Sequence, residues 1–206
     1  MKRIFLIIVG IFFLASNSLA GSVYFTGLDF GPALGQPSFS YLYDDVELTL
    51  EPGVFPTGEA TLWWDNQDGI GVQFSYEQDE IEASEYLKLS FSETLRLETV
   101  YIADLFNERG YLEGGYYQTN GVGPWVEFAA LPGQVIGSSN GERSLFIDEM
   151  VNYITFTAPG LLQNGENHEY ALQGISTGTP APLPSAILLL GSGVFGLAAI
   201  RRKFKT

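Results

Sequence analysis

Short segments in which apolar and polar residues alternate dominate the chain between residues 21 and 176. The clearest lie at residues 46–50, 86–91, 94–103, 153–157 and 170–175. A period of two places alternate side chains on opposite faces of a β-strand, and helical periodicity is scarce in this region. In residues 94–103 one face is expected to carry Leu95, Leu97, Thr99, Tyr101 and Ala103, and the other Arg96 and Glu98. The pattern predicts an all-β fold.

Five further strands are expected where β-branched and aromatic residues are frequent, at residues 23–30, 60–64, 70–74, 111–119 and 125–128. Gly, Pro, Asn and Asp separate the segments at intervals of about 8–15 residues. About ten short strands with such turns favour a β-sandwich or a jelly-roll-like domain. A single helical turn is allowed at residues 103–109.

The first residues of the chain have the three parts of a secretory signal peptide. Lys2 and Arg3 precede an apolar run at residues 4–15, and the small residues Ser18 and Ala20 follow it. We expect signal peptidase to cut between Ala20 and Gly21. The alternative is an uncleaved N-terminal anchor, although the apolar run is shorter than the roughly 20 residues of a membrane-spanning helix.

The charge of the chain is distributed unevenly. All 24 acidic residues lie between residues 21 and 184, with only four basic ones (Lys88, Arg96, Arg109 and Arg143), so this part has a net charge of −20. Such a surface repels phosphate backbones, which excludes nucleic acid as a partner, and it favours divalent cations or basic partners. The chain has no Cys, which excludes disulfides, thiol catalysis and Cys-based zinc sites.

The sequence contains no recognisable catalytic set. The single histidine, His168, does not make a zinc site, which needs three or four nitrogen or sulfur ligands. The pattern Gly-x-Ser-x-Gly occurs at residues 137–141 and 174–178, but neither stretch lies between a predicted strand and a predicted helix, as a nucleophile elbow requires. Carboxylates cluster at residues 79–85 and 148–149, but nothing places two of them across a cleft, as glycoside hydrolysis requires. We therefore expect a protein without enzymatic activity, and an extracellular hydrolase is the least favoured class.

Oxygen-bearing residues around one turn are the main candidates for ligand chemistry. They are Asp65, Asn66, Asp68, Asp79, Glu80 and Glu82. Calcium binds six to eight oxygens from flexible loops, so these residues form a candidate calcium site. The spacing is not that of an EF-hand, and the alternative is a plain hairpin turn in which Asp68 and Gly69 serve the backbone. No cofactor is required, and calcium is the one candidate.

Two tryptophans are candidates for stacking against sugar rings. Trp63 and Trp64 are adjacent, so on a strand they face opposite sides and one of them is expected in the core. We assign sugar stacking to Trp64 and Trp125, the latter in a Gly- and Pro-rich segment.

Residues 177–206 have three parts in a fixed order. A Pro-rich spacer is followed by an apolar stretch at residues 183–200 and by a basic cluster. The distinctive residues are Pro182, Leu183 and Pro184, and then Arg201, Arg202 and Lys203. As a helix the apolar stretch spans about 27 Å, which is marginal for a hydrocarbon core of roughly 30 Å. The basic cluster predicts a cytoplasmic end, and the signal peptide predicts an external domain.

This tail resembles the PEP-CTERM sorting signal of Gram-negative bacteria. In that family a Pro-Glu-Pro-like motif precedes a short Leu- and Gly-rich span and a basic end; here Leu183 stands where Glu is commonest. The segments 188–193 and 196–198 fit the same pattern. The resemblance implies cleavage by an exosortase in bacteria that make extracellular polysaccharide and biofilm. The middle of the chain is similar to the β-sandwich ectodomains of such proteins. A plain C-terminal anchor is the alternative.

The expected organisation is a signal peptide (1–20), a β-sandwich ectodomain (21–176), a Pro-rich linker with the sorting motif (177–184), and a transmembrane helix with a basic tail (185–206). We expect a surface or extracellular-matrix protein that is first anchored in the inner membrane. Its expected partners are signal peptidase, an exosortase-type enzyme, the membrane and exopolysaccharide. An envelope-anchored carbohydrate-binding module is the alternative function.

Overall fold

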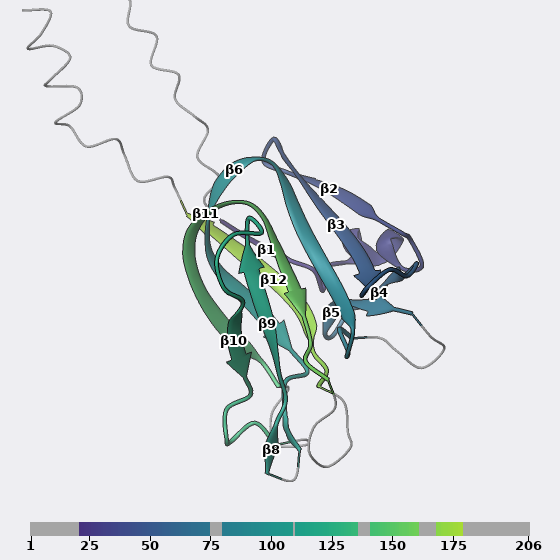
Figure 1. Ribbon diagram of the computed structural model, residues 1–206. Helices are drawn as coiled ribbons and strands as arrows, with labels where there is room; N and C mark the ends of the chain where they lie inside the picture. Colours follow the sequence, from purple (N-terminus) through teal and green to yellow (C-terminus); the bar gives the residue numbers. More distant parts are fainter. Residues whose placement is uncertain (1–20, 75–79, 109, 136–140, 161–167, 179–206) are drawn as a thin grey trace, which may run out of the picture.

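The computed structural model describes residues 21–74, 80–108, 110–135, 141–160 and 168–178 (Figure 1). Of these residues 61% lie in strands and 4% are helical, which confirms the prediction of an all-β fold. The elements are β1 (Gly21–Tyr24), η1 (Leu28–Ala33), β2 (Phe39–Tyr43), β3 (Val46–Val54), β4 (Thr61–Asp65), β5 (Gly69–Gln73), β6 (Glu85–Ala103), β7 (Asn107–Glu108), β8 (Tyr111–Leu112), β9 (Gly114–Thr119), β10 (Val126–Ala129), β11 (Arg143–Thr157) and β12 (Ala171–Gly178).

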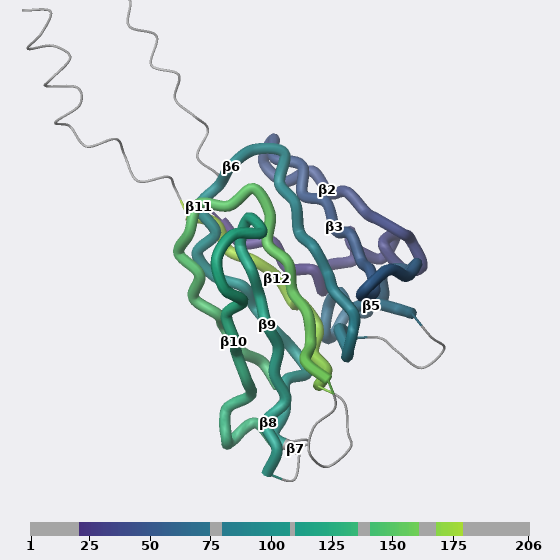
Figure 2. Tube along the Cα trace, viewed as in Figure 1, coloured from purple at the N-terminus to yellow at the C-terminus, as the bar shows by residue number. Residues whose placement is uncertain are grey.

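Two long strands, β6 and β11, organise a curled antiparallel sheet (Figures 1 and 2). They pair with each other along most of their length. The first half of β6 also pairs with β3, and its second half pairs with β12. The main hydrogen-bonded order is β10-β9-β11-β6-β12-β5-β4, with β2 and β3 joined through β6 and β1 joined to β12. Ten of the strands therefore belong to one continuous sheet, while β7 and β8 pair separately.

The core is a single cluster of apolar side chains to which most of the strands contribute. Its largest fully buried members include Phe25, Phe30, Phe156 and Tyr170, with Leu and Ile side chains from β3 to β6 and from β12. Full burial of a side chain of this size stabilises the fold by about 1.5–3 kcal/mol. Hydrophobic burial thus takes the place of the absent disulfides.

Strand β6 differs from the two separate strands predicted at residues 86–91 and 94–103. It is one strand of 19 residues in which the alternation changes phase. Leu97 is buried as predicted, but Val100 and Ile102 are buried in place of Thr99 and Tyr101. The register explains the error. On both neighbouring strands the pairing passes from Leu97 to Thr99 and leaves Glu98 unpaired. One extra residue in a β-bulge moves the following side chains to the opposite faces.

One other local prediction is wrong, and one element that the sequence allowed is absent from the described residues. Residues 23–30 do not form one strand, because β1 ends at Tyr24 and the 3-10 helix η1 begins at Leu28. The helical turn allowed at residues 103–109 is absent, since β7 occupies Asn107–Glu108. The backbone N–H groups there donate to distant acceptors: Leu105 to Gly141 O at 3.1 Å, and Asn107 to Gln134 O at 2.6 Å.

Candidate functional site

Three of the predicted calcium ligands lie at the β4–β5 hairpin: Asp65 is the last residue of β4, and Asn66 and Asp68 lie in the turn that follows. Asp65 Oδ1 accepts hydrogen bonds from the backbone N–H groups of Gln67 and Asp68, both at 2.7 Å. A carboxylate that closes its own turn in this way is the arrangement expected for a plain hairpin. The geometry of this turn therefore favours the alternative to a calcium site.

The remaining predicted ligands are separated from that turn by the length of β5. Glu80 O accepts a hydrogen bond from Val72 N at 3.1 Å, near the far end of β5. Four residues of strand, about 13 Å, separate Val72 from Asp68. Glu82 lies two residues beyond Glu80, and Asp79 lies outside the described residues. Within the described ranges, no group of three or more Asp, Glu, His or Cys side chains is placed to hold a metal ion. The calcium site stays a prediction.

Asp68 belongs instead to an acidic cavity that the sequence did not indicate. The cavity has a volume of about 460 Å³, and its lining includes Asp104 beyond β6, Glu142 before β11 and Gln173 of β12. Burial, together with the negative charges of Asp104 and Asp65, raises the pKa of Asp68 to about 7. Burial and the neighbouring charges therefore favour the protonated form of Asp68. The topology brings these carboxyls together from distant parts of the chain, so no local motif marks them.

Trp64 is held by a hydrogen bond and by packing against the core. Its Nε1–H donates a hydrogen bond to Phe25 O at 2.7 Å, and its ring packs against the core. A Cβ on Gly31 of η1 would lie 3.4 Å from the same ring. With its polar edge and one face occupied in this way, Trp64 fixes η1 to the sheet.

Trp125, by contrast, lines an open cavity of about 560 Å³, which we call the aromatic cleft. The cleft is lined by Phe55, Ser84, Tyr116, Trp125, Thr157, Ala158 and Gly160. Two of its aromatic side chains remain accessible: Phe55 is 47% exposed and Trp125 is 40% exposed. The prediction singled out Trp125 by residue type, but it did not find the other lining residues.

The strand register places Thr157 and Tyr116 of the cleft in one row with Tyr86. Tyr86 of β6 pairs with Gly53 of β3 and with Thr157 of β11, and Thr157 pairs with Tyr116 of β9. Directly paired residues share a face, and because Leu87 is buried in the core this row lies on the outer face. The ring of Tyr86 covers Gly53, where a Cβ would lie 2.3 Å from it. The rings of Phe55 and Tyr86 are 4.9 Å apart.

The polar groups of the cleft are hydroxyls and one indole. Thr157 Oγ1 donates to Glu85 O at 2.6 Å, which leaves lone pairs on the hydroxyl oxygen as acceptors. The hydroxyls of Ser84 and Tyr116, and the Nε1–H of Trp125, make no hydrogen bond to another described residue. None of the described lining residues carries a formal charge. The cleft can therefore bind an uncharged ligand that has both an apolar face and hydroxyl groups.

The turn that carries Trp125 is held in place by side-chain hydrogen bonds. Gln118 Nε2 donates to Gly123 O at 2.7 Å, within the turn. Asn120 Nδ2 donates to Met150 O at 3.0 Å, and its Oδ1 accepts from Asn152 N at 2.7 Å. These bonds fix the turn that precedes Trp125 to β11.

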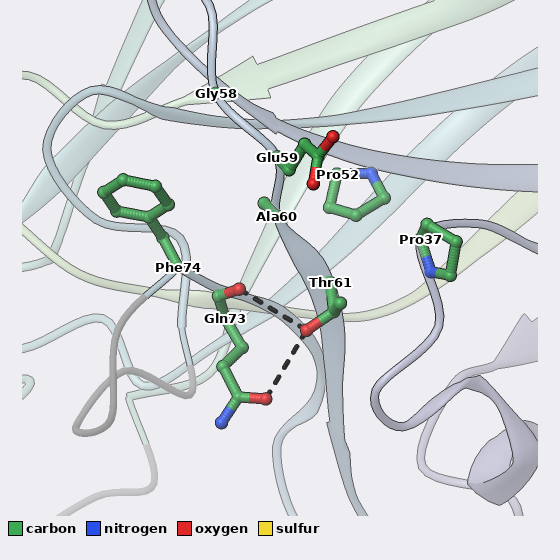
Figure 3. A pocket seen from close by; sticks show the side chains of 8 residues that line it. All are labelled: Pro37, Pro52, Gly58, Glu59, Ala60, Thr61, Gln73 and Phe74. Carbon is green, nitrogen blue, oxygen red and sulfur yellow. Dashed lines mark hydrogen bonds between the residues drawn. The ribbon is translucent and has the colours of Figure 1, made fainter.

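A larger hollow of about 840 Å³ lies beside the β4–β5 hairpin (Figure 3). It is lined by Pro37, Pro52, Gly58, Glu59, Ala60, Thr61, Gln73 and Phe74. Thr61 Oγ1 donates to the backbone and side-chain oxygens of Gln73, each at 3.5 Å. Glu59 is the one acidic residue of the described lining, so this hollow does not supply the carboxylate pair that glycoside hydrolysis uses.

His168 lies in a small cavity beside Glu127 and Tyr116. Burial lowers the pKa of its imidazole, although the charge of Glu127 and a hydrogen bond with the Gly114 backbone oppose that shift. The described lining of this cavity contains no Ser, Thr or Cys that the imidazole would activate.

The predicted sorting residues Pro182, Leu183, Pro184, Arg201, Arg202 and Lys203 lie outside the described residues, as does Ala20; Gly21 is described. In the described ranges, no helix has the length and apolar character needed to cross a membrane. Comparison with known proteins found no matching family model, no matching curated protein and no matching solved structure.

Proposed function

We propose that this chain is a non-enzymatic exported protein of the cell surface or extracellular matrix, sorted through its C-terminal tail by an exosortase-type enzyme. The supporting observation is the ladder between β1 and β12, which runs from Gly21 opposite Thr177 to Tyr24 opposite Gly174. The first and last described strands thus close on each other. We interpret this curled sheet as a sandwich- or jelly-roll-like ectodomain whose first and last described strands lie next to the two predicted targeting segments in the sequence.

A carbohydrate-binding module is the second candidate, and the outer face of the sheet favours it. Beside the row of Tyr86, Thr157 and Tyr116, a parallel row pairs Lys88 with Thr155 and Thr155 with Gln118. Aromatic rings, hydroxyls and amides on one face offer both stacking and hydrogen bonding to sugars. This surface would give an exported protein a means of contact with exopolysaccharide.

The sorting proposal is tested by fractionation of the producing bacterium and mass spectrometry of the mature termini. We expect cleavage after Ala20 and, in strains with the sorting enzyme, loss of the tail. Replacing both Pro182 and Pro184 by Ala should leave uncut precursor in the inner membrane. Pro180→Ala, in the same spacer but outside the motif, is the matched control and should be processed normally. Tail removal in the double variant, or in strains without the enzyme, would contradict the proposal.

A further inference from the structure

We propose that the aromatic cleft binds a neutral hexopyranose unit of a polysaccharide chain, stacked on Trp125 and Phe55. The inference rests on the proposed interaction role. It adds the class of ligand and the residues that bind it.

The two accessible rings provide the apolar part of the site. Phe55 and Trp125 come from segments about 70 residues apart in the sequence, yet both line one cavity and both remain exposed. A hexopyranose has an apolar C–H face that can cover such a ring, and aromatic side chains release a large contact area from water when covered. The cavity volume of about 560 Å³ lies within the roughly 300–1,000 Å³ of small-ligand sites.

Hydrogen-bonding groups surround these rings. The backbone oxygen of Ser84 accepts a hydrogen bond from the backbone N–H of Phe55 at 2.7 Å. This bond joins Phe55, which is proposed to stack on the sugar, to Ser84, which carries a hydroxyl group. Ser84 also has a φ of 71°, a left-handed conformation that is strained for a residue with a side chain. Such strain is concentrated at ligand sites. With Tyr116 and the indole N–H of Trp125, the cleft offers several groups to the hydroxyls of a sugar.

The absence of charged side chains from the described lining favours a neutral ligand. The described lining has no charged side chain, although residues 21–184 carry a net charge of −20. An anionic polysaccharide would meet this field without a cationic side chain in the cleft to bind it. A basic peptide would find no carboxylate in the described lining. A neutral sugar requires neither, so it fits the cleft better than both.

The binding test uses the full chain, purified in a mild detergent, and isothermal titration with soluble polymers of glucose, mannose, galactose and N-acetylglucosamine. Alginate and a short polylysine peptide represent the anionic and basic alternatives. We expect at least one neutral polymer to bind. Trp125→Ala and Phe55→Ala should each weaken that binding about tenfold or more, equivalent to about 1.4 kcal/mol.

Two variants keep the result interpretable. Trp125→Phe keeps a ring and should retain most of the affinity, which separates stacking from a folding defect. Phe146→Ala removes another exposed ring, 76% exposed on β11 and outside the cleft, and should leave affinity unchanged. An unchanged melting temperature for each variant confirms that it is folded.

Three results would overturn the inference. They are binding to none of the neutral polymers, neutral-polymer binding that survives both alanine substitutions, and preferential binding of alginate or polylysine in a manner that depends on Trp125. None of these results would affect the sorting proposal, because that proposal depends on the mature termini. Failed sorting, conversely, would leave the binding data intact.

Discussion

Glu85 is a buried carboxyl group whose protonation state affects the stability of this domain. Its side chain is only 1% exposed. Oε2 accepts the backbone N–H of Glu82 at 2.9 Å, while Oε1 has no hydrogen-bond partner among the described residues. Burial raises the pKa of this carboxyl to about 7, with a further contribution from the charge of Glu82. Ionising Glu85 in the folded protein is therefore unfavourable.

This carboxyl predicts that stability falls as the pH rises. Its folded pKa of about 7 exceeds the value of about 4.3 for an unperturbed Glu, so its contribution is complete below pH 4 and lost as the pH passes 7. The loss is at most about 4 kcal/mol. Asp68, whose pKa is also raised to about 7, adds a smaller effect of the same sign because it is only half-buried.

Glu85→Gln tests this prediction, because it keeps an acceptor for Glu82 N–H and removes the ionisable group. In the full chain, thermal unfolding from pH 5 to pH 8 should give a flatter decline of melting temperature for the variant than for the wild type. Adding Asp68→Asn should flatten the decline further. A wild-type stability that rises over this interval, or equal slopes in all three proteins, would show that these carboxyls do not control the pH response.

At the scale of elements, β6 shows which features of a strand can be predicted from the sequence and which cannot. Period-two alternation located most of the strands, because each face of a strand is specified locally. The change of phase at Glu98 depends on long-range pairing. Opposite it, Asp148 on β11 has a φ of 54° and accepts a hydrogen bond from Arg96 Nε at 2.6 Å. These contacts join positions about 50 residues apart, so no window of sequence reveals them.

The bulge predicts which substitutions in β6 are costly. Ile102 is fully buried, so Ile102→Ala should lower the free energy of unfolding by about 2–5 kcal/mol. Thr99→Ala, on the other face, should change it by less than about 1 kcal/mol. Urea denaturation of the full-chain variants measures both. Without the phase change the order would be reversed, so a larger cost at Thr99 would contradict the bulge.

The aromatic cleft follows the same division between local and long-range information. Trp125 was identifiable from its residue type and its Gly- and Pro-rich surroundings. Phe55, Ser84 and Thr157 were not, because four separate segments meet only through the register of β3, β6, β11 and β9. Trp64 has the same side chain as Trp125 but is fixed by its hydrogen bond to Phe25 O. Residue type identifies candidate binding residues, but the long-range pairing of strands determines which of them line the cleft.

At the scale of the whole molecule, the acidic charge is poorly compensated. In the described part of the chain two salt bridges occur, Lys88 with Glu51 and Arg96 with Asp148. All four side chains are about one-third exposed or more, and exposed pairs contribute about 0–1 kcal/mol each. Repulsion among the remaining carboxylates therefore opposes the compact state, and dissolved ions weaken that repulsion.

Salt should therefore stabilise the full chain mainly by screening. The two groups of predicted calcium ligands lie at opposite ends of β5, so we expect sodium, magnesium and calcium chlorides at matched ionic strength to raise the melting temperature by similar amounts. A specific calcium site would behave differently, since at 100 times its dissociation constant calcium would add about 2.7 kcal/mol, or roughly 5–10 °C. A calcium-specific excess of that size, abolished by Asp65→Asn with Asp68→Asn, would establish the site and show that screening is only part of the stabilisation.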